Sequence, residues 1–213
     1  MTLKSRLLRI YDGMRPKGYW DRRYRRGGTS GAGSVGESRN WKWVLIERYA
    51  GKVDEVVDVG CGDLSFWEGR DCEKYTGIEI SEYIVEKNRA QRPSWNFVLA
   101  SADKPLDLHA KVVICMDLLF HIPDDRTFSR TLLNLASYSN EWLFIHTWAV
   151  NPMKHGRSDF YQKFREFRPE ELKGFHPLAA ETNPFSPSSK MFVLRRNGST
   201  LDSEANRRLR ASE

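Results

Sequence analysis

The stretch Val56-Val57-Asp58-Val59-Gly60-Cys61-Gly62-Asp63 decides the fold of this chain. The run from Val53 to Val59 is short, rich in β-branched residues and without polar alternation, which predicts a strand buried on both faces. Gly60 and Gly62 then allow the backbone to turn sharply and to approach a ligand closely. A buried strand that ends in such a turn predicts a nucleotide-binding site at the carboxyl end of the strand.

Segments with strand and helix patterns alternate along the rest of the chain. The alternation predicts an α/β fold, a Rossmann-like, doubly wound and mostly parallel sheet with right-handed crossovers. Residues 176–190 contain three prolines and several serines, so we expect a loop there. We expect helices over residues 37–50, 64–70, 82–91 and 124–136, and strands over residues 53–59, 75–80, 95–99, 112–116, 142–146 and 191–194.

Three parts are expected along the chain. Residues 1–40 form a basic, glycine-rich lid and substrate segment, residues 41–196 the ligand-binding domain, and residues 197–213 a polar tail. Leu3 to Tyr11 has the spacing of a short helix. Residues 27–36 hold five glycines and cannot form the interior of a helix or strand. They are either a flexible linker or a loop that closes on a ligand, and the tryptophans on both sides favour the second interpretation.

Acidic side chains follow three further expected strands. Glu79 comes 19 residues after Gly60, at the spacing of an acid that accepts hydrogen bonds from ribose hydroxyls. The alternative is an ordinary surface acid. Ser65 occupies the position of the third glycine in the dinucleotide pattern, which argues against NAD. Asp103 and Asp117 follow the next two strands, so the ends of four strands carry candidate ligand-binding groups.

These four motifs, in this order, resemble the class I (Rossmann-like) methyltransferases that depend on S-adenosylmethionine (SAM), over roughly residues 53–148. The resemblance implies SAM as the cofactor. It places the turn at Asp58 on the methionine side, Glu79 on the ribose, Asp103 on the adenine and Asp117 beside the methyl group. The cofactor-binding residues that the resemblance implies are Asp58, Gly60, Cys61, Gly62, Glu79, Ile80, Ala102, Asp103, Asp117 and Leu118.

The segment Asp117-Leu118-Leu119-Phe120-His121 is where an acceptor is expected. Enzymes that methylate amines of adenine or cytosine carry an acid, two prolines and an aromatic residue here, and this chain lacks both prolines. Small-molecule methyltransferases often carry similar segments, so the likeness leaves both classes open. We expect Asp117 to orient an amine and receive its proton, and Phe120 to stack on a base. His121 is either a general base or a capping residue without a catalytic role.

The distribution of charge suggests an acceptor. The net charge is +6 and the isoelectric point about 9.3, with arginines gathered near both ends. Such clusters predict an anionic partner, and our first hypothesis is an exocyclic base amine of RNA, for example ribosomal RNA. The alternatives are a small-molecule or peptide methyltransferase and a non-catalytic protein that binds SAM or RNA. The residues expected to contact the acceptor are Tyr19, Trp20, Arg23, Tyr24, Gly31 and Ser34.

The remaining composition gives expectations about what this chain lacks. Cys61, Cys72 and Cys115 do not form a pattern typical of disulfides, and no His/Cys cluster has the spacing of a metal site. No apolar run reaches the ~20 residues of a membrane span, and the charged N-terminus does not resemble a signal peptide. We therefore expect a monomeric, cytoplasmic protein without a metal or a membrane partner.

Overall fold

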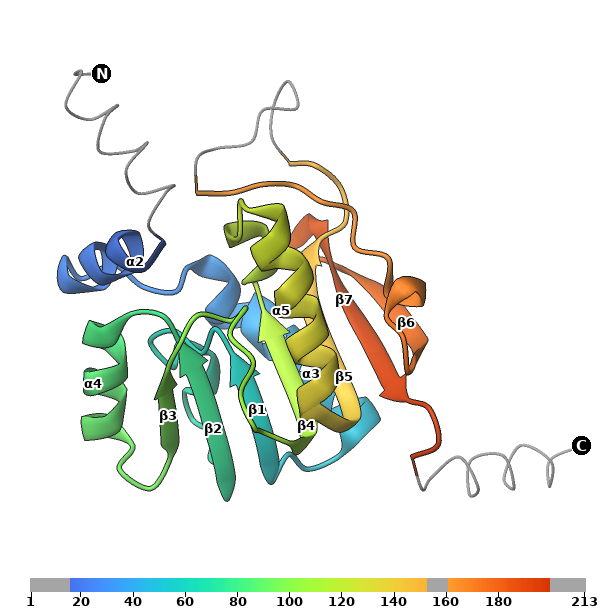
Figure 1. Ribbon diagram of the computed structural model, residues 1–213, viewed down its shortest axis with the longest axis horizontal. Helices are drawn as coiled ribbons and strands as arrows, with labels where there is room; N and C mark the ends of the chain where they lie inside the picture. Colours follow the sequence, from blue (N-terminus) through green and yellow to red (C-terminus); the bar gives the residue numbers. More distant parts are fainter. Residues whose placement is uncertain (1–15, 153–160, 200–213) are drawn as a thin grey trace, which may run out of the picture.

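A seven-stranded sheet forms the centre of the molecule in the computed structural model, which describes residues 16–152 and 161–199 (Figure 1). The strand order is β3-β2-β1-β4-β5-β7-β6. Neighbours among the first five strands are parallel, whereas β7 runs antiparallel to both β5 and β6. The predicted α/β fold is therefore confirmed. The strands are β1 (Glu55–Val59), β2 (Lys74–Glu79), β3 (Asn96–Leu99), β4 (Ala110–Met116), β5 (Ser139–Trp148), β6 (Phe175–Asn183) and β7 (Ser186–Arg196).

Helices cover both faces of this sheet. In Figure 1, α5 lies in front of the sheet and α3 behind it. Trp43 and Ile46 of α3 pack in one buried cluster, and Leu135 of α5 packs in a second cluster on the other face. The α-helices of the described residues are α2 (Pro16–Arg25), α3 (Gly36–Ala50), α4 (Glu82–Gln91) and α5 (Asp125–Tyr138). Short 3₁₀ helices are η1 (Ala32–Ser34), η2 (Ser65–Trp67), η3 (Leu119–His121) and η5 (Pro169–Glu171).

Two helices begin with a side-chain N-cap of a residue type that is common at this position. Ser81 caps α4 by accepting a hydrogen bond from the backbone nitrogen of Ile84 (3.4 Å), and Asp124 caps α5 through Thr127 (2.7 Å). Both helices begin just after a strand end or its loop. Their N-termini are consequently fixed beside the carboxyl edge of the sheet, where ligands bind in this type of fold.

Two local expectations were wrong. Residues 64–70 form only the 3₁₀ turn η2, and residues 176–190 belong to a hairpin of β6 and β7 instead of a loop. The prolines misled the second prediction. Pro177 lies in β6, the edge strand, and Pro187 lies at the start of β7, positions where a missing N–H is tolerated.

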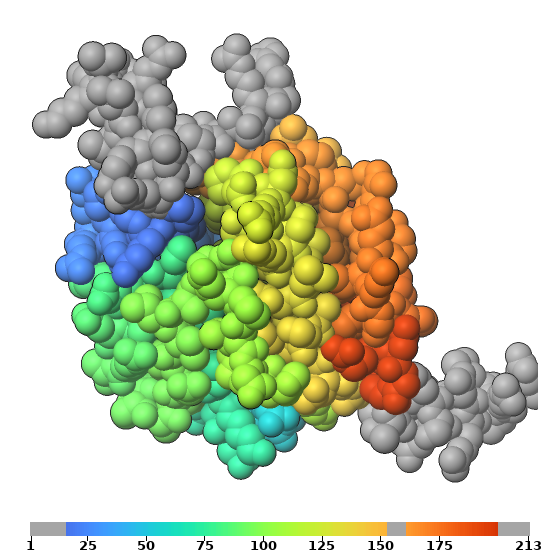
Figure 2. Space-filling model, viewed as in Figure 1, coloured from blue at the N-terminus to red at the C-terminus, as the bar shows by residue number. Residues whose placement is uncertain are grey.

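The N-terminal segment, residues 16–35, lies against the carboxyl edge of the sheet. Asp21 of α2 accepts hydrogen bonds from Ser81 Oγ (2.6 Å) and from the backbone nitrogen of Tyr83 (3.3 Å) at the start of α4. Figure 2 shows the blue surface of this segment resting on the green surface of the α4 region. The helix expected over residues 3–11 lies outside the described residues, as does most of the expected tail, and the three-part division of the chain stays a prediction.

Two features are absent from residues 16–152 and 161–199. No helix among them is long and apolar enough to cross a membrane. The same residues contain no group of three or more His, Cys, Asp or Glu side chains that could hold a metal ion.

Candidate active site

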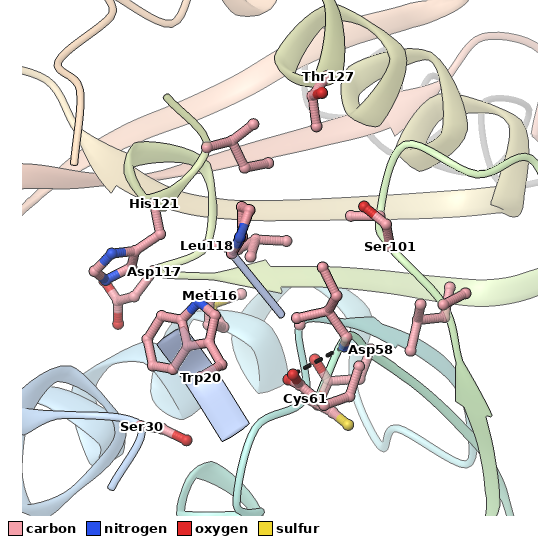
Figure 3. Close-up of a pocket in the computed structure, with 18 of the residues that line it drawn as sticks. Trp20, Ser30, Asp58, Cys61, Ser101, Met116, Asp117, Leu118, His121 and Thr127 are labelled. Carbon is pink, nitrogen blue, oxygen red and sulfur yellow. Dashed lines mark hydrogen bonds between the residues drawn. The ribbon is translucent and has the colours of Figure 1, made fainter. Parts of the chain in front are cut away.

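A cavity of about 260 Å³ lies where the parallel strands end. In Figure 3, Asp58 and Cys61 from the end of β1, Ser101 after β3, and Asp117 and His121 after β4 surround it. Trp20 and Ser30 of the N-terminal segment close another side. The full lining is Pro16, Trp20, Tyr24, Ser30, Ser34, Asp58, Gly60, Cys61, Phe66, Ile78, Glu79, Ile80, Ala100, Ser101, Ala102, Met116, Asp117, Leu118, His121, Ile122, Pro123, Asp124 and Thr127.

The glycine turn after β1 fits tightly between its neighbours. Gly60 and Gly62 have φ angles of 82° and 56°, a region that favours glycine. A Cβ on Gly62 would lie 2.1 Å from Ser30 Oγ, and one on Gly60 would lie 3.0 Å from the Leu118 side chain. The two glycines therefore permit both the turn itself and the close approach of the N-terminal segment and of the β4 end.

Ser30 holds the N-terminal segment on this turn. Its hydroxyl donates to Asp63 Oδ1 (2.7 Å) and accepts from the backbone nitrogen of Asp63 (3.0 Å). The backbone nitrogen of Ser30 donates to Asp63 Oδ2 (3.1 Å). Burial alone would raise the pKa of Asp63, but these hydrogen bonds and those from Ser65 lower it. Asp63 is thus ionised and joins the turn to the segment that closes the cavity.

Two buried carboxyls line the cavity beside the turn. Glu79 accepts hydrogen bonds from the backbone nitrogens of Gly62 (3.1 Å), Ile80 (2.9 Å) and Ser81 (2.9 Å), yet burial raises its pKa to about 7. Asp58 accepts from Trp67 Nε1 (2.8 Å) and the Tyr75 hydroxyl (3.0 Å), and burial raises its pKa to about 6. A ligand that brings hydroxyl donors or a positive charge would stabilise the ionised form of both groups.

The loop after β3 presents different residues than expected. Ser101 and Ala102 line the cavity, whereas Asp103 is not among the lining residues. Asp103 Oδ1 instead accepts a hydrogen bond from Ser101 Oγ (2.5 Å). A direct contact between Asp103 and an adenine is a prediction without support from this geometry, and Ser101 is the polar side chain of this loop that faces the cavity.

Asp117, after β4, is already paired within the protein. Its φ is 58°, its Oδ1 lies 2.6 Å from His146 Nδ1, and its Oδ2 pairs with the buried ammonium of Lys42. Burial alone would raise the pKa of Asp117, but His146 and Lys42 together hold it well below its usual range. Both oxygens of this carboxylate already pair with a cation or an N–H donor, which argues against the expected role of Asp117 as a base.

His121 lies in the cavity wall as a neutral ring. Burial lowers its pKa to about 4. Its Nδ1 lies 3.3 Å from the carbonyl oxygen of Tyr161, so Nδ1 carries the proton and donates it to that carbonyl. Nε2 then holds a lone pair, and among residues 16–152 and 161–199 no group donates to it. His121 can therefore accept a hydrogen bond from a ligand.

The residues expected to contact the acceptor divide into two groups. Trp20, Tyr24 and Ser34 line the cavity, whereas Tyr19, Arg23 and Gly31 do not. Tyr19 stacks on Tyr161, with ring centroids 5.2 Å apart, and Arg23 Nε donates to the Thr29 carbonyl (2.7 Å).

Phe120 also lies away from the cavity. It is buried and stacks on Trp148 with centroids 4.3 Å apart, so its face is not free for a base. Sequence reasoning also missed several lining residues that carry no motif of their own, namely Ser30, Phe66, Met116, Ile122 and Thr127.

The charged residues that line the cavity are all acidic. They are Asp58, Glu79, Asp117 and Asp124, and within the described part of the chain no lysine or arginine belongs to the lining. The rest of the wall is neutral, with aliphatic and aromatic residues and a few hydroxyls. Such a wall favours a ligand that is neutral or cationic where it touches the protein.

Part of the chain matches a known protein family. Residues 57–136, which run from β1 through most of α5, match the family model described as a methyltransferase domain. The match indicates a methyltransferase domain over these residues. It contains the glycine turn, Glu79 and the segment Asp117–His121, so the residues of the cavity that the resemblance singled out lie within the matched region.

Curated relatives match about half of the chain. The chain is 30% identical over 119 residues to a ubiquinone biosynthesis O-methyltransferase of Nitrosospira multiformis, a match of 51% of this chain and 48% of that protein. A ubiquinone biosynthesis O-methyltransferase of Sodalis glossinidius is 29% identical over 118 residues, with 51% and 47% covered. The match thus spans about half the length of these relatives.

Solved structures share the fold of the methyltransferase domain. Magnesium protoporphyrin IX methyltransferase from Synechocystis PCC 6803 with bound SAM has a TM-score of 0.56 and 17% identity, over 92% of this chain and 99% of that chain. Burkholderia thailandensis 1,6-didemethyltoxoflavin-N1-methyltransferase has a TM-score of 0.62 and 14% identity, over 92% and 91%. At these identities the likeness concerns the fold.

The lining of the cavity fits SAM as the cofactor of the domain. SAM carries a sulfonium, an ammonium and two ribose hydroxyls, and the cavity offers the buried carboxyls of Asp58 and Glu79. Bound there, SAM supplies an activated methyl group.

Proposed function

We propose that this protein transfers the methyl group of SAM to a small, uncharged acceptor that binds between the N-terminal segment and His121. The observation that carries the proposal is the composition of the cavity wall. Trp20, Tyr24, Ile122 and Pro123 line it together with acidic residues, and no lysine or arginine of the described residues does. An acceptor with a phosphate or carboxylate near its reacting atom would meet only like charges in this wall.

The names of the relatives agree with a small acceptor. The curated relatives are O-methyltransferases of ubiquinone biosynthesis, and the Burkholderia structure contains bound 1,6-didemethyltoxoflavin. Both oxygen and ring-nitrogen acceptors therefore occur among these proteins. For this chain we propose an acceptor that carries an O–H or N–H group on a flat, largely apolar body.

The hypothesis of an RNA substrate loses its main support. The comparisons give small-molecule methyltransferases, and several basic side chains of α2 make contacts within the protein. Lys17 pairs with Glu82 (3.0 Å), and the guanidinium of Arg25 lies 4.8 Å from the centre of the Tyr83 ring. Arg23 lies over Trp20 at 5.8 Å. Lys17 and Arg25 thus fasten α2 to α4, so these two charges have a structural role without an anionic partner.

His121 is the proposed catalytic residue. Its unprotonated Nε2 accepts a hydrogen bond from the O–H or N–H of the acceptor and orients the lone pair of that atom. In the transfer, the acceptor lone pair forms the bond to the methyl carbon, the electrons of the broken carbon–sulfur bond stay on sulfur, and the acceptor proton passes to Nε2. Asp117, paired with Lys42 and His146, keeps a positioning role in this proposal.

A labelling experiment tests the proposal directly. The purified full chain is incubated with methyl-labelled SAM and, in separate reactions, with the low-molecular-weight fraction of a cell extract, with total RNA and with a peptide mixture. We expect label in the small-molecule fraction alone. Label in nucleosides released from RNA would overturn the proposal. Binding of SAM without label in any fraction would favour the non-catalytic alternative.

A further inference from the structure

Lys42 is a buried cation that the methyltransferase motifs do not include. It lies in α3, its side chain is fully buried, and its Nζ donates to the carbonyl oxygen of Gly33 (2.9 Å) and to Asp117 Oδ2. Asp117 comes from the end of β4 and Gly33 from the N-terminal segment. One ammonium therefore joins three parts of the chain beside the cavity, and a buried charge requires such partners.

The hydrogen bonds continue from Asp117 to the hairpin of β6 and β7. Because Asp117 is ionised, His146 Nδ1 donates to it, and His146 Nε2 then accepts from Asn183 Nδ2 (3.1 Å). Asn183 Nδ2 also donates to Ser38 Oγ (3.1 Å). Burial lowers the pKa of His146, so its ring is neutral. The network thus holds one positive charge, on Lys42, and one negative charge, on Asp117.

The negative end of this pair faces the cavity. Asp117 lines it and keeps 17% of its side chain exposed, whereas Lys42 is 0% exposed. Asp117 also lies close to the glycine turn, because β4 pairs with β1 and the side chain of Leu118 lies 3.0 Å from where a Cβ on Gly60 would be. The end of the cavity that would receive the cationic methionine part of SAM is therefore next to Asp117.

We infer that Lys42 sets the charge that Asp117 presents to the cavity and thereby sets the preference of the site for SAM over S-adenosylhomocysteine. This inference rests on the proposed function. The two molecules have nearly the same shape and differ by one methyl group and one positive charge. With Lys42 in place, the pair is neutral and the preference is small. An unpaired Asp117 would favour SAM, and an unpaired Lys42 would disfavour it. Lys42 is a positioning residue in this scheme, since it acts through Asp117.

The wild type and three variants separate the effect of charge from that of packing. Lys42→Met removes the positive charge, Asp117→Asn removes the negative charge, and the double variant removes both. Asparagine tolerates the positive φ of position 117 and still accepts a hydrogen bond from His146 through its Oδ1. The measured quantity is the ratio of the dissociation constants of S-adenosylhomocysteine and SAM, by isothermal titration calorimetry at pH 8.

We expect the ratio to rise about tenfold in Lys42→Met and to fall about tenfold in Asp117→Asn. It should return to the wild-type value in the double variant, whose cavity edge is neutral again. A purely structural role predicts losses for both ligands alike and the largest loss in the double variant. If Lys42→Met does not fold, the fall in Asp117→Asn and its reversal in the double variant still decide the question.

Arg48→Met is the matched control. Arg48 lies in the same helix and pairs with Glu181 at 3.4 Å, but both side chains are exposed. In Arg48→Met, the ratio of the two dissociation constants should equal that of the wild type. Unchanged ratios in Asp117→Asn and Lys42→Met would overturn the inference alone. A wild type that binds neither compound would overturn the proposed function, and the inference with it.

Discussion

The two halves of the cavity are built in different ways. The half that we propose for the cofactor consists of lining residues 58–102, which lie at the ends of β1 and β2 and in the loops after β1, β2 and β3. The acceptor half consists of Trp20, Tyr24, His121, Ile122 and Thr127, which come from α2, from η3 and the residue after it, and from α5. The cofactor half is specified by short stretches of sequence, and the acceptor half exists only when distant segments meet.

The contacts of each half reflect this difference. In the cofactor half, hydrogen bonds fix the carboxyls, as in the three backbone nitrogens that donate to Glu79. In the acceptor half, rings pack on rings: Trp20 meets His121 edge-on at 5.1 Å, and His121 stacks on Tyr161 at 5.9 Å. We therefore expect changes in the first half to alter cofactor binding, and changes in the second half to alter the acceptor or turnover.

The largest effect should follow from His121→Gln. Loss of the basic Nε2 should lower kcat about 1000-fold, within the range for a general base. The Kd of SAM should stay within about threefold of the wild-type value. Steady-state kinetics and calorimetry measure the two quantities. His109→Gln, at an exposed position, is the control and should leave both kcat and the Kd of SAM unchanged. Equal loss in both variants would remove His121 from the catalytic role.

Gly62→Ala should break the cofactor half. An alanine at this position would have a strained φ, and its Cβ would lie 2.1 Å from Ser30 Oγ. We therefore expect the Kd of SAM to rise about 100-fold. Gly69→Ala is matched to it, because Gly69 has a φ of 74° and no atom within 4 Å of the added Cβ. This control should lose stability in thermal unfolding and keep its affinity for SAM. Unchanged affinity in Gly62→Ala would show that the turn does not hold the cofactor.

Trp20→Ala should affect the acceptor half alone. The loss of the ring that borders His121 should raise the KM for the acceptor about tenfold, with the Kd of SAM changed less than threefold. Trp20→Phe keeps an aromatic face and should recover most of the affinity. A comparable loss of SAM affinity in Trp20→Ala would mean that the two halves are not separable in this way.

The smallest effect concerns pH. Burial raises the pKa of Glu79 to about 7 and that of Asp58 to about 6, so both become protonated and neutral as the pH falls through this range. A cationic, hydroxyl-bearing cofactor favours the ionised forms, so the Kd of SAM should rise about fivefold from pH 8 to pH 5.5. Calorimetry across this range measures the change. Glu79→Gln should flatten its upper part, and an equally steep profile in that variant would exclude Glu79 as the source.

Short-range patterns account for what could be predicted. The strand–turn unit around Gly60 and the spacing to Glu79 are properties of neighbouring residues, and they led to the fold and the cofactor half. Asp117 was identified as a cavity residue, but its partners Lys42 and His146 lie in α3 and β5, and only the folded chain brings them together.

A weak signal for Lys42 existed. Lys42, Leu45 and Ile46 have the i, i+3, i+4 spacing of one helix face, and that face is buried. A lysine on such a face requires a buried acid, but the sequence does not show which one. The hairpin of β6 and β7 was hidden in a similar way, because prolines at the sheet edge resemble a loop when the neighbouring strand is not known.

A crystal structure of the full chain with S-adenosylhomocysteine tests the division of the cavity most directly. We predict the ribose hydroxyls on the Glu79 carboxylate, the sulfur between the glycine turn and Asp117, and open space from the sulfur toward His121 and Trp20. A ligand bound elsewhere, or one whose sulfur faces away from His121, would contradict the assignment of the two halves and the methyl transfer built on it.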